Sequence, residues 1–341
     1  MALRRWFGGF VVWSRTIRQR IGADRIRFIK QAALAGWFLE FTAIGIQNLV
    51  SIQAPIGMDI RIYYRGVQNW LNGGDPWAAS AFANHHTFNY AGSPATTVLL
   101  APSALFTEDQ FTVLWLALAA FSAVAVIRQL RLPIWWLLFP PTAEALYSGN
   151  PQLVVLMLLL ASAGRMGFVA DSIAVALKVY AVIPLFGERQ LKRVALAFGF
   201  TIATFAIAPS LWINYAEKFG AISTRLAEQS EHGYSAFYYP ILLVPTAIAI
   251  LLLWRRDPKA AAWLAVPALW PSSEFHYSTF AQPVMTPLLS VMLAVPVHFL
   301  APIAIMLYVF WRYAADPIHA HLAAWAADWS ASQPKAVGPA A

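Results

Sequence analysis

The sequence contains no cysteine among its 341 residues. Disulfide bonds, thiolate nucleophiles, iron–sulfur clusters and zinc–thiolate sites are therefore excluded, although this absence does not identify the compartment. Charged side chains are also scarce, because they make up 12% of the chain against 59% hydrophobic residues, and the mean hydropathy is +0.56. Soluble domains carry about twice that share of charge, roughly 25%. This scarcity predicts an integral membrane protein.

Long apolar stretches recur along nearly the whole chain, among them residues 31–50, 111–127, 191–215 and 240–254. Each approaches the length that a helix needs to cross a hydrocarbon core of about 30 Å. The stretches are continuous rather than alternating, and backbone groups in lipid must be hydrogen-bonded within their own segment, so helices are favoured over barrel strands. We predict an all-α, polytopic bundle of about nine to eleven membrane helices.

The net charge of +8 and the pI of about 9.8 could suggest a nucleic-acid partner, but the distribution of charge does not. Eight of the 24 basic residues precede residue 31, opposed only by Asp24: Arg4, Arg5, Arg15, Arg18, Arg20, Arg25, Arg27 and Lys30. The positive-inside rule then places the N-terminus in the cytoplasm. No signal peptide is expected, because no small-residue cleavage site follows the first apolar run. We expect a basic cytoplasmic or interfacial segment (1–30), a membrane module (31–313) and a short, partly disordered tail (314–341), with membrane lipids rather than nucleic acid as partners.

Polar residues are concentrated in a few places between the apolar stretches. Residues 51–93 form a long loop that is expected to be external, and within it residues 60–71 predict a short interfacial helix that ends at the sequence NGGDP. Two further polar islands are residues 147–152 and 270–277. Lys178 stands alone inside an apolar segment, where an unpaired cation is costly and usually functional.

The order of these polar motifs resembles that of a known family. The motifs are MDIRIYY at 58–64, LNGGDPW at 71–77, GNPQ at 149–152, Leu177-Lys178 followed by Pro184, and the segment 271–283. Over residues 31–283 the ordered set resembles the GT-C glycosyltransferases, most closely the family eighty-seven branch. The chain departs from that family at residues 90–94, which read YAGSP where the family commonly has Tyr-Pro-Pro, and at 275–277, which read FHY in place of Asp-His-His.

The resemblance implies a membrane enzyme that moves mannose or a related sugar from a polyprenyl-phosphate donor to a hydroxyl of a lipid or glycan acceptor. The reaction is expected on the external face of the cytoplasmic membrane, without a cofactor. Asp59 is the expected general base, because it lies at the membrane boundary just after the first apolar run, and direct displacement would invert the anomeric centre.

The donor phosphate needs cationic groups in a low-dielectric setting. Lys178 and His276 are the first candidates, and Arg61 and Arg65 are further ones. Contacts with the sugar or acceptor are expected from a wider set of polar and aromatic residues: Tyr63, Asp75, Tyr90, Asn150, Gln152, Glu274 and Tyr277.

A metal site is not expected. His85 and His86 are adjacent rather than four residues apart, and Arg61 occupies the second acidic position that an Asp-x-Asp chelating pair would need after Asp59. A monophosphate donor is therefore favoured.

Purely structural roles are open alternatives for the same residues. Asp59 could cap a helix, Lys178 could pair with Asp171, and His276 could be an interfacial histidine that is hydrogen-bonded beside Tyr277. An inactive homologue would keep the fold and survive the loss of Asp59.

A transporter or lipid flippase is the rival function. Its binding site would use Lys178, Asp171, Glu144 and Glu40 near the midplane between two similar halves, although the sequence shows no clear inverted repeat. A transferase would instead gather Asp59, Lys178 and His276 around one site. Basic residues after several apolar stretches cannot all be cytoplasmic under simple alternation of crossings, so a broken or re-entrant helix is expected within residues 94–106 or 168–186.

Overall fold

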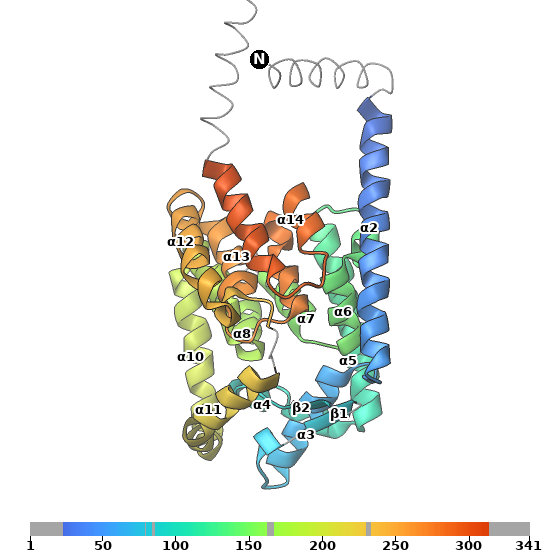
Figure 1. Cartoon of the computed structure of the whole chain (residues 1–341). Helices are drawn as coiled ribbons and strands as arrows, with labels where there is room; N and C mark the ends of the chain where they lie inside the picture. The colour runs from blue at the N-terminus through green and yellow to red at the C-terminus, as the bar shows by residue number, and fades with distance from the viewer. Residues whose placement is uncertain (1–22, 79, 84–85, 162–166, 230–232, 314–341) are drawn as a thin grey trace, which may run out of the picture.

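The computed structural model describes residues 23–78, 80–83, 86–161, 167–229 and 233–313, and Figure 1 shows their arrangement. The basic residues before 23, Arg165, His85 and the tail 314–341 lie outside these described ranges. The predicted helical fold is confirmed. One two-stranded antiparallel hairpin, β1 (Ser80–Ala83) with β2 (His86–Asn89), adds a feature that an all-α description lacks; it pairs Ser80 with Asn89.

The helices differ greatly in length, and so in their ability to cross a bilayer. Among the described residues, two are long and apolar enough to do so, within α2 (Ala23–Ser51) and as α5 (Glu108–Gln129). Two bent pairs bring the number of candidate spans to four: α6 (Pro140–Ser148) with α7 (Gln152–Ala161), and α10 (Leu191–Ile207) with α11 (Pro209–Gln229). These lengths support membrane association through two to four spans, fewer than the nine to eleven predicted, because the other apolar stretches form shorter helices.

Broken helices occur in both regions where one was predicted. Residues 94–106 form α4 (Pro94–Leu99) and the 3-10 turn η2 (Ala101–Leu105). Residues 168–186 form most of α8 (Gly167–Leu177), then a break at Lys178, the turn η4 (Val179–Ala181) and α9 (Val182–Gly187). The α6–α7 pair bends by 114° at Gly149 to Pro151, and the α10–α11 pair by 107°. These breaks bring polar backbone and side chains into an otherwise apolar bundle.

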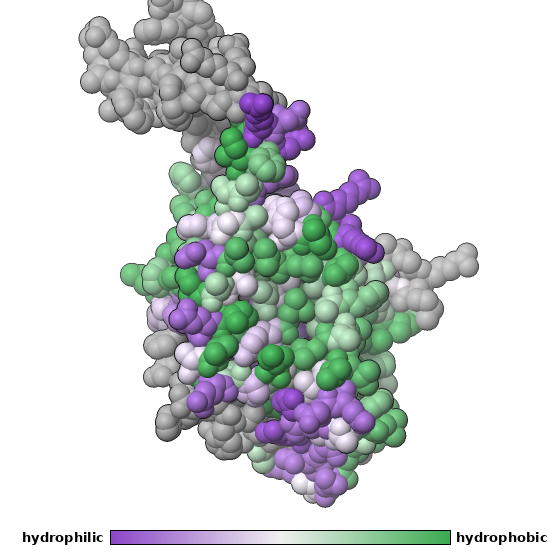
Figure 2. Space-filling view, turned by 90° about the vertical axis from the view of Figure 1, so that its right-hand side faces the viewer, coloured by the Kyte–Doolittle hydropathy of each residue, from purple (hydrophilic) through white to green (hydrophobic). Residues whose placement is uncertain are grey.

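The molecule has two distinct ends along α2 (Figure 1). The lower end, where α2 finishes, carries the hairpin, α4, α11 and α3 (Met58–Leu71), the helix predicted over 60–71. The upper end carries the start of α2 and the end of the helix Leu300–Tyr313. Figure 2 shows a broad hydrophobic surface across the middle of the side that carries α2, with hydrophilic residues gathered at the lower end. A hydrophobic band of this kind between polar ends suits a bilayer.

The buried residues of the described chain form four clusters, of which two are large. The first joins α3, α5, α7, α8 and α10 around large side chains such as Trp115, Tyr180 and Phe280. The second lies between α2, the turn η3 (Ile134–Leu138), α12 (Pro240–Arg256) and α13 (Pro258–Leu269), where Phe38 packs against Trp136 and Phe139. Four short elements complete the fold: η1 (Pro76–Ala78), η5 (Ala236–Tyr238), η6 (Phe275–Val284) and α14 (Pro287–Met292). Of these, η6 carries His276 and Tyr277 into the core.

Candidate functional site

Asp59 lies in the first turn of α3, held by the bend between α6 and α7. Asn150 Nδ2 in that bend donates a hydrogen bond of 2.7 Å to Asp59 Oδ2. Asn150 Oδ1 in turn accepts a bond of 3.1 Å from the backbone N–H of Gln152. A carboxylate and an amide that are 91 residues apart in the chain are thus fixed against each other. Asn150, predicted as a sugar or acceptor contact, therefore also positions the predicted base.

Two glycines make this contact possible. Gly57, which precedes α3, has φ 73°, and Gly149, which ends α6, has φ 68°. A Cβ atom on Gly149 would lie 3.2 Å from Gly57 Cα, and one on Gly57 would lie 2.5 Å from Thr112 Cγ2. The Gly57 N–H donates to the Tyr147 carbonyl at 2.8 Å, and Trp115 Nε1 donates to the Gly149 carbonyl at 2.9 Å. Only residues without a side chain allow both the left-handed backbone and this close approach.

Lys178 lies at the break after α8, close to the inward face of α3. Thr96 Oγ1 holds the end of α8 by donating to the Ala176 carbonyl at 2.7 Å. The Lys178 Nζ atom lies 5.6 Å from the centre of the Tyr63 ring and 5.8 Å from that of Tyr277, and it interacts electrostatically with Asp59. The predicted base and the predicted phosphate ligand therefore share one environment.

His276 completes this group from η6. Its side chain is 1% exposed, with Nδ1 at 3.2 Å from Glu144 Oε1 and 3.6 Å from Glu274 Oε2. Burial opposes the charged imidazolium, but the hydrogen bond with Glu144 and the charges of Glu274, Glu144 and Asp59 outweigh it and raise the pKa of His276 above 6.5. The Glu274 side chain is 56% exposed, so it both neighbours His276 and meets solvent. We call Asp59, Glu144, Lys178, Glu274 and His276 the charged cluster.

Two buried side-chain nitrogens around the charged cluster lack partners among the described residues. Within the described part of the chain, Gln152 Nε2 and His276 Nε2 are buried without a hydrogen-bond partner. Gln152 Oε1 accepts a hydrogen bond from Tyr180 Oη, and the Tyr180 ring lies 4.9 Å from that of Tyr277. Unsatisfied buried N–H groups cost free energy, and functional sites are one place where they persist. A ligand with acceptor oxygens would satisfy both.

Four of the predicted site residues lie elsewhere or are covered. Arg61 and Arg65 project from the opposite face of α3, where they pair with Glu108 at 3.1 and 2.9 Å. Asp75 pairs with Lys218 at 2.8 Å and also accepts a bond from the Trp77 N–H. Tyr90 is 1% exposed. In the structure the polar groups of these four residues are engaged by opposite charges or by packing, and the predicted contacts with phosphate, sugar or acceptor stay predictions.

Tyr90 packs against Tyr63, and so has a structural contact with the site. Its ring packs edge-on against Tyr63 at 5.3 Å, and its hydroxyl lies 2.8 Å from Thr97 Oγ1. A Cβ on Gly66 would meet that ring at 2.6 Å. Tyr90 thereby fixes the position of Tyr63, which contacts Lys178.

The residues expected for a transporter separate into different environments. Glu144 belongs to the charged cluster through His276, whereas Asp171 pairs with Arg193 at 3.4 Å and Glu40 is exposed on α2. The pair between Lys178 and Asp171, the structural alternative for the lysine, is thus replaced by one between Asp171 and Arg193. Among the described residues, no group of three or more His, Asp or Glu side chains has the arrangement of a metal site.

Sequence reasoning did not assign Glu144 to the same site as Asp59. Its signal is present, since it is the lone charged residue between Arg131 and Arg165 in an apolar stretch, but spacing alone could not show that it faces His276, 132 residues further along the chain. Comparisons with protein-family models, with curated proteins and with solved structures found no match to this chain.

Proposed function

We propose that this protein is a membrane glycosyltransferase. It transfers a sugar, with mannose as the first candidate, from a polyprenyl-phosphate donor to a hydroxyl of a lipid or glycan acceptor. The observation that carries the proposal is the convergence of Asp59, Lys178 and His276 in one charged cluster, although they lie on three elements that are far apart in the sequence. A carboxylate beside two cationic groups is the combination that displacement of a sugar phosphate requires.

In the proposed reaction Asp59 accepts the proton of the acceptor hydroxyl while its oxygen attacks the anomeric carbon. The bond from that carbon to the phosphate oxygen breaks, and polyprenyl phosphate leaves with the electron pair. The hydrogen bond of 2.7 Å from Asn150 holds the Asp59 carboxylate during this step. Because attack and departure occur on opposite sides of the carbon, the product has the inverted configuration.

Lys178 and His276 serve as the phosphate ligands in this proposal. The Lys178 ammonium lies between the rings of Tyr63 and Tyr277, where cation–π contacts direct it. His276 carries its proton because Glu144 and Glu274 flank it, and its Nε2, together with Gln152 Nε2, offers a buried donor without a partner among the described residues. Phosphate oxygens would accept from both and gain charge stabilisation in a region of low dielectric constant.

Tyr63, Tyr277, Asn150 and Glu274 are the proposed contacts to the sugar and acceptor. Tyrosine rings form apolar walls against a sugar ring, and the exposed carboxylate of Glu274 gives the group a side that meets solvent. The orientation follows from the basic N-terminal segment. In the proposed orientation that segment is cytoplasmic, α2 crosses the cytoplasmic membrane once, and α3 and the hairpin lie on its external face, with further helices completing a multi-pass GT-C-like bundle.

The test is transfer of radiolabelled mannose from polyprenyl-phosphate-mannose into membrane lipids and glycans. Membranes carrying the native chain are compared with membranes carrying Asp59→Asn, and with membranes lacking the chain. Asp109→Asn is a matched control, because Asp109 is an 83% exposed carboxylate at the same end that pairs with Arg61 on the opposite face of α3. We expect Asp59→Asn to lower transfer by roughly 10²- to 10⁴-fold at equal expression.

The outcomes separate the rival functions. Full activity in Asp59→Asn would remove Asp59 as the base and favour a structural role through its hydrogen bond with Asn150. Equal loss in Asp59→Asn and Asp109→Asn would assign both losses to folding. No transfer by the native chain with any polyprenyl-phosphate sugar would contradict the proposed reaction and leave a transporter to be tested by substrate uptake into vesicles.

A further inference from the structure

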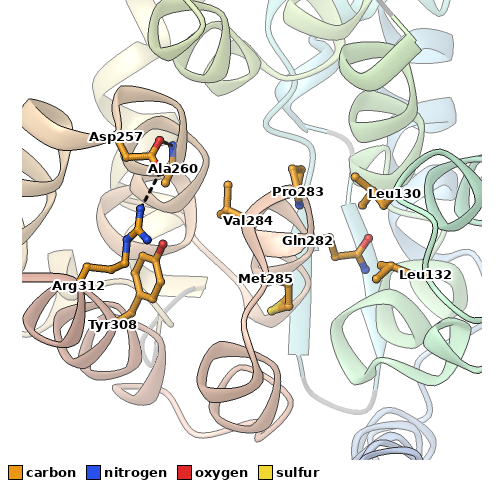
Figure 3. A pocket seen from close by; sticks show the side chains of 10 residues that line it. All are labelled: Leu130, Leu132, Asp257, Ala260, Gln282, Pro283, Val284, Met285, Tyr308 and Arg312. Atoms are coloured by element: carbon orange, nitrogen blue, oxygen red, sulfur yellow. Dashed lines mark hydrogen bonds and ion pairs between the residues drawn. The ribbon is translucent and has the colours of Figure 1, made fainter. Parts of the chain in front are cut away.

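A cavity of about 370 Å³ is lined by residues at the end of η6, the element whose start carries His276. It is bounded by the loop after α5, the junction between α12 and α13, the end of η6 and the helix Leu300–Tyr313 (Figure 3). Its volume falls in the range of small-molecule sites, about 300–1,000 Å³. No residue of the proposed transfer reaction lines it, so it calls for a separate explanation.

The lining divides into an apolar part and a polar part. Leu130, Leu132 and Met285 form part of the apolar side, while Asp257 and Arg312 form an ion pair of 3.5 Å across from them (Figure 3). Gln282 lies on the apolar side, beside Leu130 and Leu132 (Figure 3). An apolar body that ends in a charged, hydrogen-bonding group would match both parts of this lining.

Gln282 provides the most specific feature of the cavity. Its side chain is 4% exposed, and Nε2 donates 2.8 Å to Thr142 Oγ1, yet Oε1 is buried without a hydrogen-bond partner in the described part of the chain. A buried carbonyl oxygen without a donor is costly. A ligand hydroxyl in the cavity would supply the missing donor.

The surroundings are strongly cationic. Arg128 and Arg131 flank Leu130 and are exposed, with no ion pair to any described residue. Arg256 donates to the Arg312 carbonyl at 3.3 Å and stacks over the Tyr313 ring at 4.0 Å. Asp257 and Glu188 are the nearby carboxylates, and each is already paired, with Arg312 and with Lys259 respectively. The excess of positive charge around the cavity favours an anionic ligand.

The exposed hydrophobic residues beside the cavity favour a lipid as the anionic ligand. The helix that contributes Tyr308 and Arg312 exposes Leu307, Phe310 and Trp311, and α12 exposes Leu251 and Trp254 beside it. Hydrophobic residues next to a basic cavity are typical of sites for anionic lipid headgroups between membrane helices. The upper end also carries the start of α2, and therefore the leaflet on the side of the N-terminus.

We infer that this cavity binds the headgroup of an anionic, hydroxyl-bearing phospholipid from the leaflet on the N-terminal side. The phosphate lies toward Arg312, the exposed Arg128 and Arg131 add positive charge beside the lining residue Leu130, and a headgroup hydroxyl donates to Gln282 Oε1. The acyl chains leave along the exposed apolar residues of the last helix.

Lipid binding to the full-length chain tests this inference without any transfer reaction. The purified protein in detergent is titrated with phosphatidylglycerol, with phosphatidylmethanol, which has the same charge but no hydroxyl, and with phosphatidylcholine, and bound lipid is counted by native mass spectrometry. We expect phosphatidylglycerol to bind about tenfold more tightly than phosphatidylmethanol, the effect of roughly one hydrogen bond of 1.4 kcal/mol. Gln282→Met should remove that preference.

A pair of double variants provides the matched control. Replacing Arg128 and Arg131 by Gln should weaken phosphatidylglycerol binding at least about fivefold, since a basic residue near an anionic lipid contributes about 1 kcal/mol. Replacing Arg189 and Lys192 by Gln removes two exposed cations at and just before the start of α10. Unlike Arg128 and Arg131, they flank no residue that lines the cavity, so this change should alter binding less than twofold. Both doubles alter only exposed side chains, so they test the inference even if Gln282→Met disturbs folding through Thr142.

Three results would overturn the inference. Equal weakening by the two double variants would indicate general surface attraction. Equal binding of the three lipids would indicate an unspecific detergent-like site. Competition by free glycerol phosphate as strong as that by phosphatidylglycerol would assign the cavity to a soluble ligand.

Discussion

The two faces of α3 both carry polar residues, but the hydrogen-bonding and charged groups around them are paired to different extents. On the outward face, Arg61 and Arg65 share the carboxylate of Glu108, and Arg61 also pairs with Asp109 at 2.8 Å. On the inward face, Asp59 and Tyr63 meet Lys178, beside buried donors on Gln152 and His276 that lack partners among the described residues. Both faces look equally polar in the sequence. The difference teaches that a charge indicates function when its surroundings leave hydrogen-bonding capacity unused, rather than when it merely interrupts an apolar chain.

Replacing one cation beside each face of α3 should give the largest difference in sugar transfer. Lys178→Met should lower sugar transfer by roughly 10²- to 10³-fold, because removing one preorganised group that stabilises a developing charge typically has that effect. Arg65→Met should lower it less than about threefold, since Arg65 serves Glu108 rather than a ligand. Initial rates at saturating and limiting donor separate loss of catalysis from loss of binding.

The reverse ranking of these two variants would invert the assignment of the faces. It would place the phosphate near Arg61 and Arg65, and the charged cluster would then have a structural role.

The next variants test the close approach of Gly57 and Gly149, which positions Asp59. Gly149→Ala should reduce stability by roughly 2–4 kcal/mol, because an alanine at φ 68° is strained and its Cβ would lie 3.1 Å from Ile60 Cγ2 and 3.2 Å from Gly57 Cα. Gly73→Ala is the control, since Gly73 also has positive φ, 78°, but its Cβ would meet nothing within 4 Å. Gly73→Ala should lower the free energy of unfolding by about 1–2 kcal/mol, the cost of the left-handed backbone conformation alone. Thermal unfolding in detergent measures both, and equal losses would show that the close approach of Gly57 and Gly149 is not required.

Much of the site could be predicted from the sequence because its parts are rare residues in apolar surroundings. Lys178 interrupts an apolar stretch, while Asp59, Asn150 and His276 lie in short polar segments between apolar stretches. The helix over 60–71 follows from its spacing and from the NGGDP sequence that ends it. The helical class and the broken segments after Pro94 and around Lys178 followed from continuous apolar runs and from charge placement.

Pairing in space could not be predicted in the same way. That Arg61 and Arg65 meet Glu108, or that Asp75 meets Lys218 across 143 residues, depends on how the elements pack. Hydropathy predicted more spans than the two to four that the described helices offer for a related reason. It measures apolar length, whereas the chain breaks several apolar runs into helices such as α8 and α9 that are too short to cross alone.

The protonation of His276 makes the charged cluster sensitive to pH. Burial opposes the charged form, but Glu144, Glu274 and Asp59 outweigh it and raise the folded-state pKa of His276 above its ordinary value. The stabilising contribution of the charged imidazole is therefore complete below pH 6.5 and is lost as pH rises through the folded-state pKa. Transfer activity and melting temperature of the native chain should both fall over that interval, while His276→Gln should be lower at pH 6 and flatter. A native profile that rises through this range would contradict a protonated His276.

The outward face of α3 should give the smallest effect. Glu108→Gln removes the carboxylate shared by Arg61 and Arg65, whose side chains are 24% and 42% exposed. Solvent screens such pairs, so we expect a loss of about 0.5–1 kcal/mol of stability and transfer within about twofold of native. Salt is the sharper probe, because 0.5 M NaCl should lower the melting temperature of the native chain and leave Glu108→Gln less affected. A loss of transfer larger than that of Lys178→Met would mean that the Glu108 pairs hold α3, and with it Asp59, in the geometry for reaction. The outward face of α3, with its ion pairs, would then be as necessary for function as the inward face that carries Asp59.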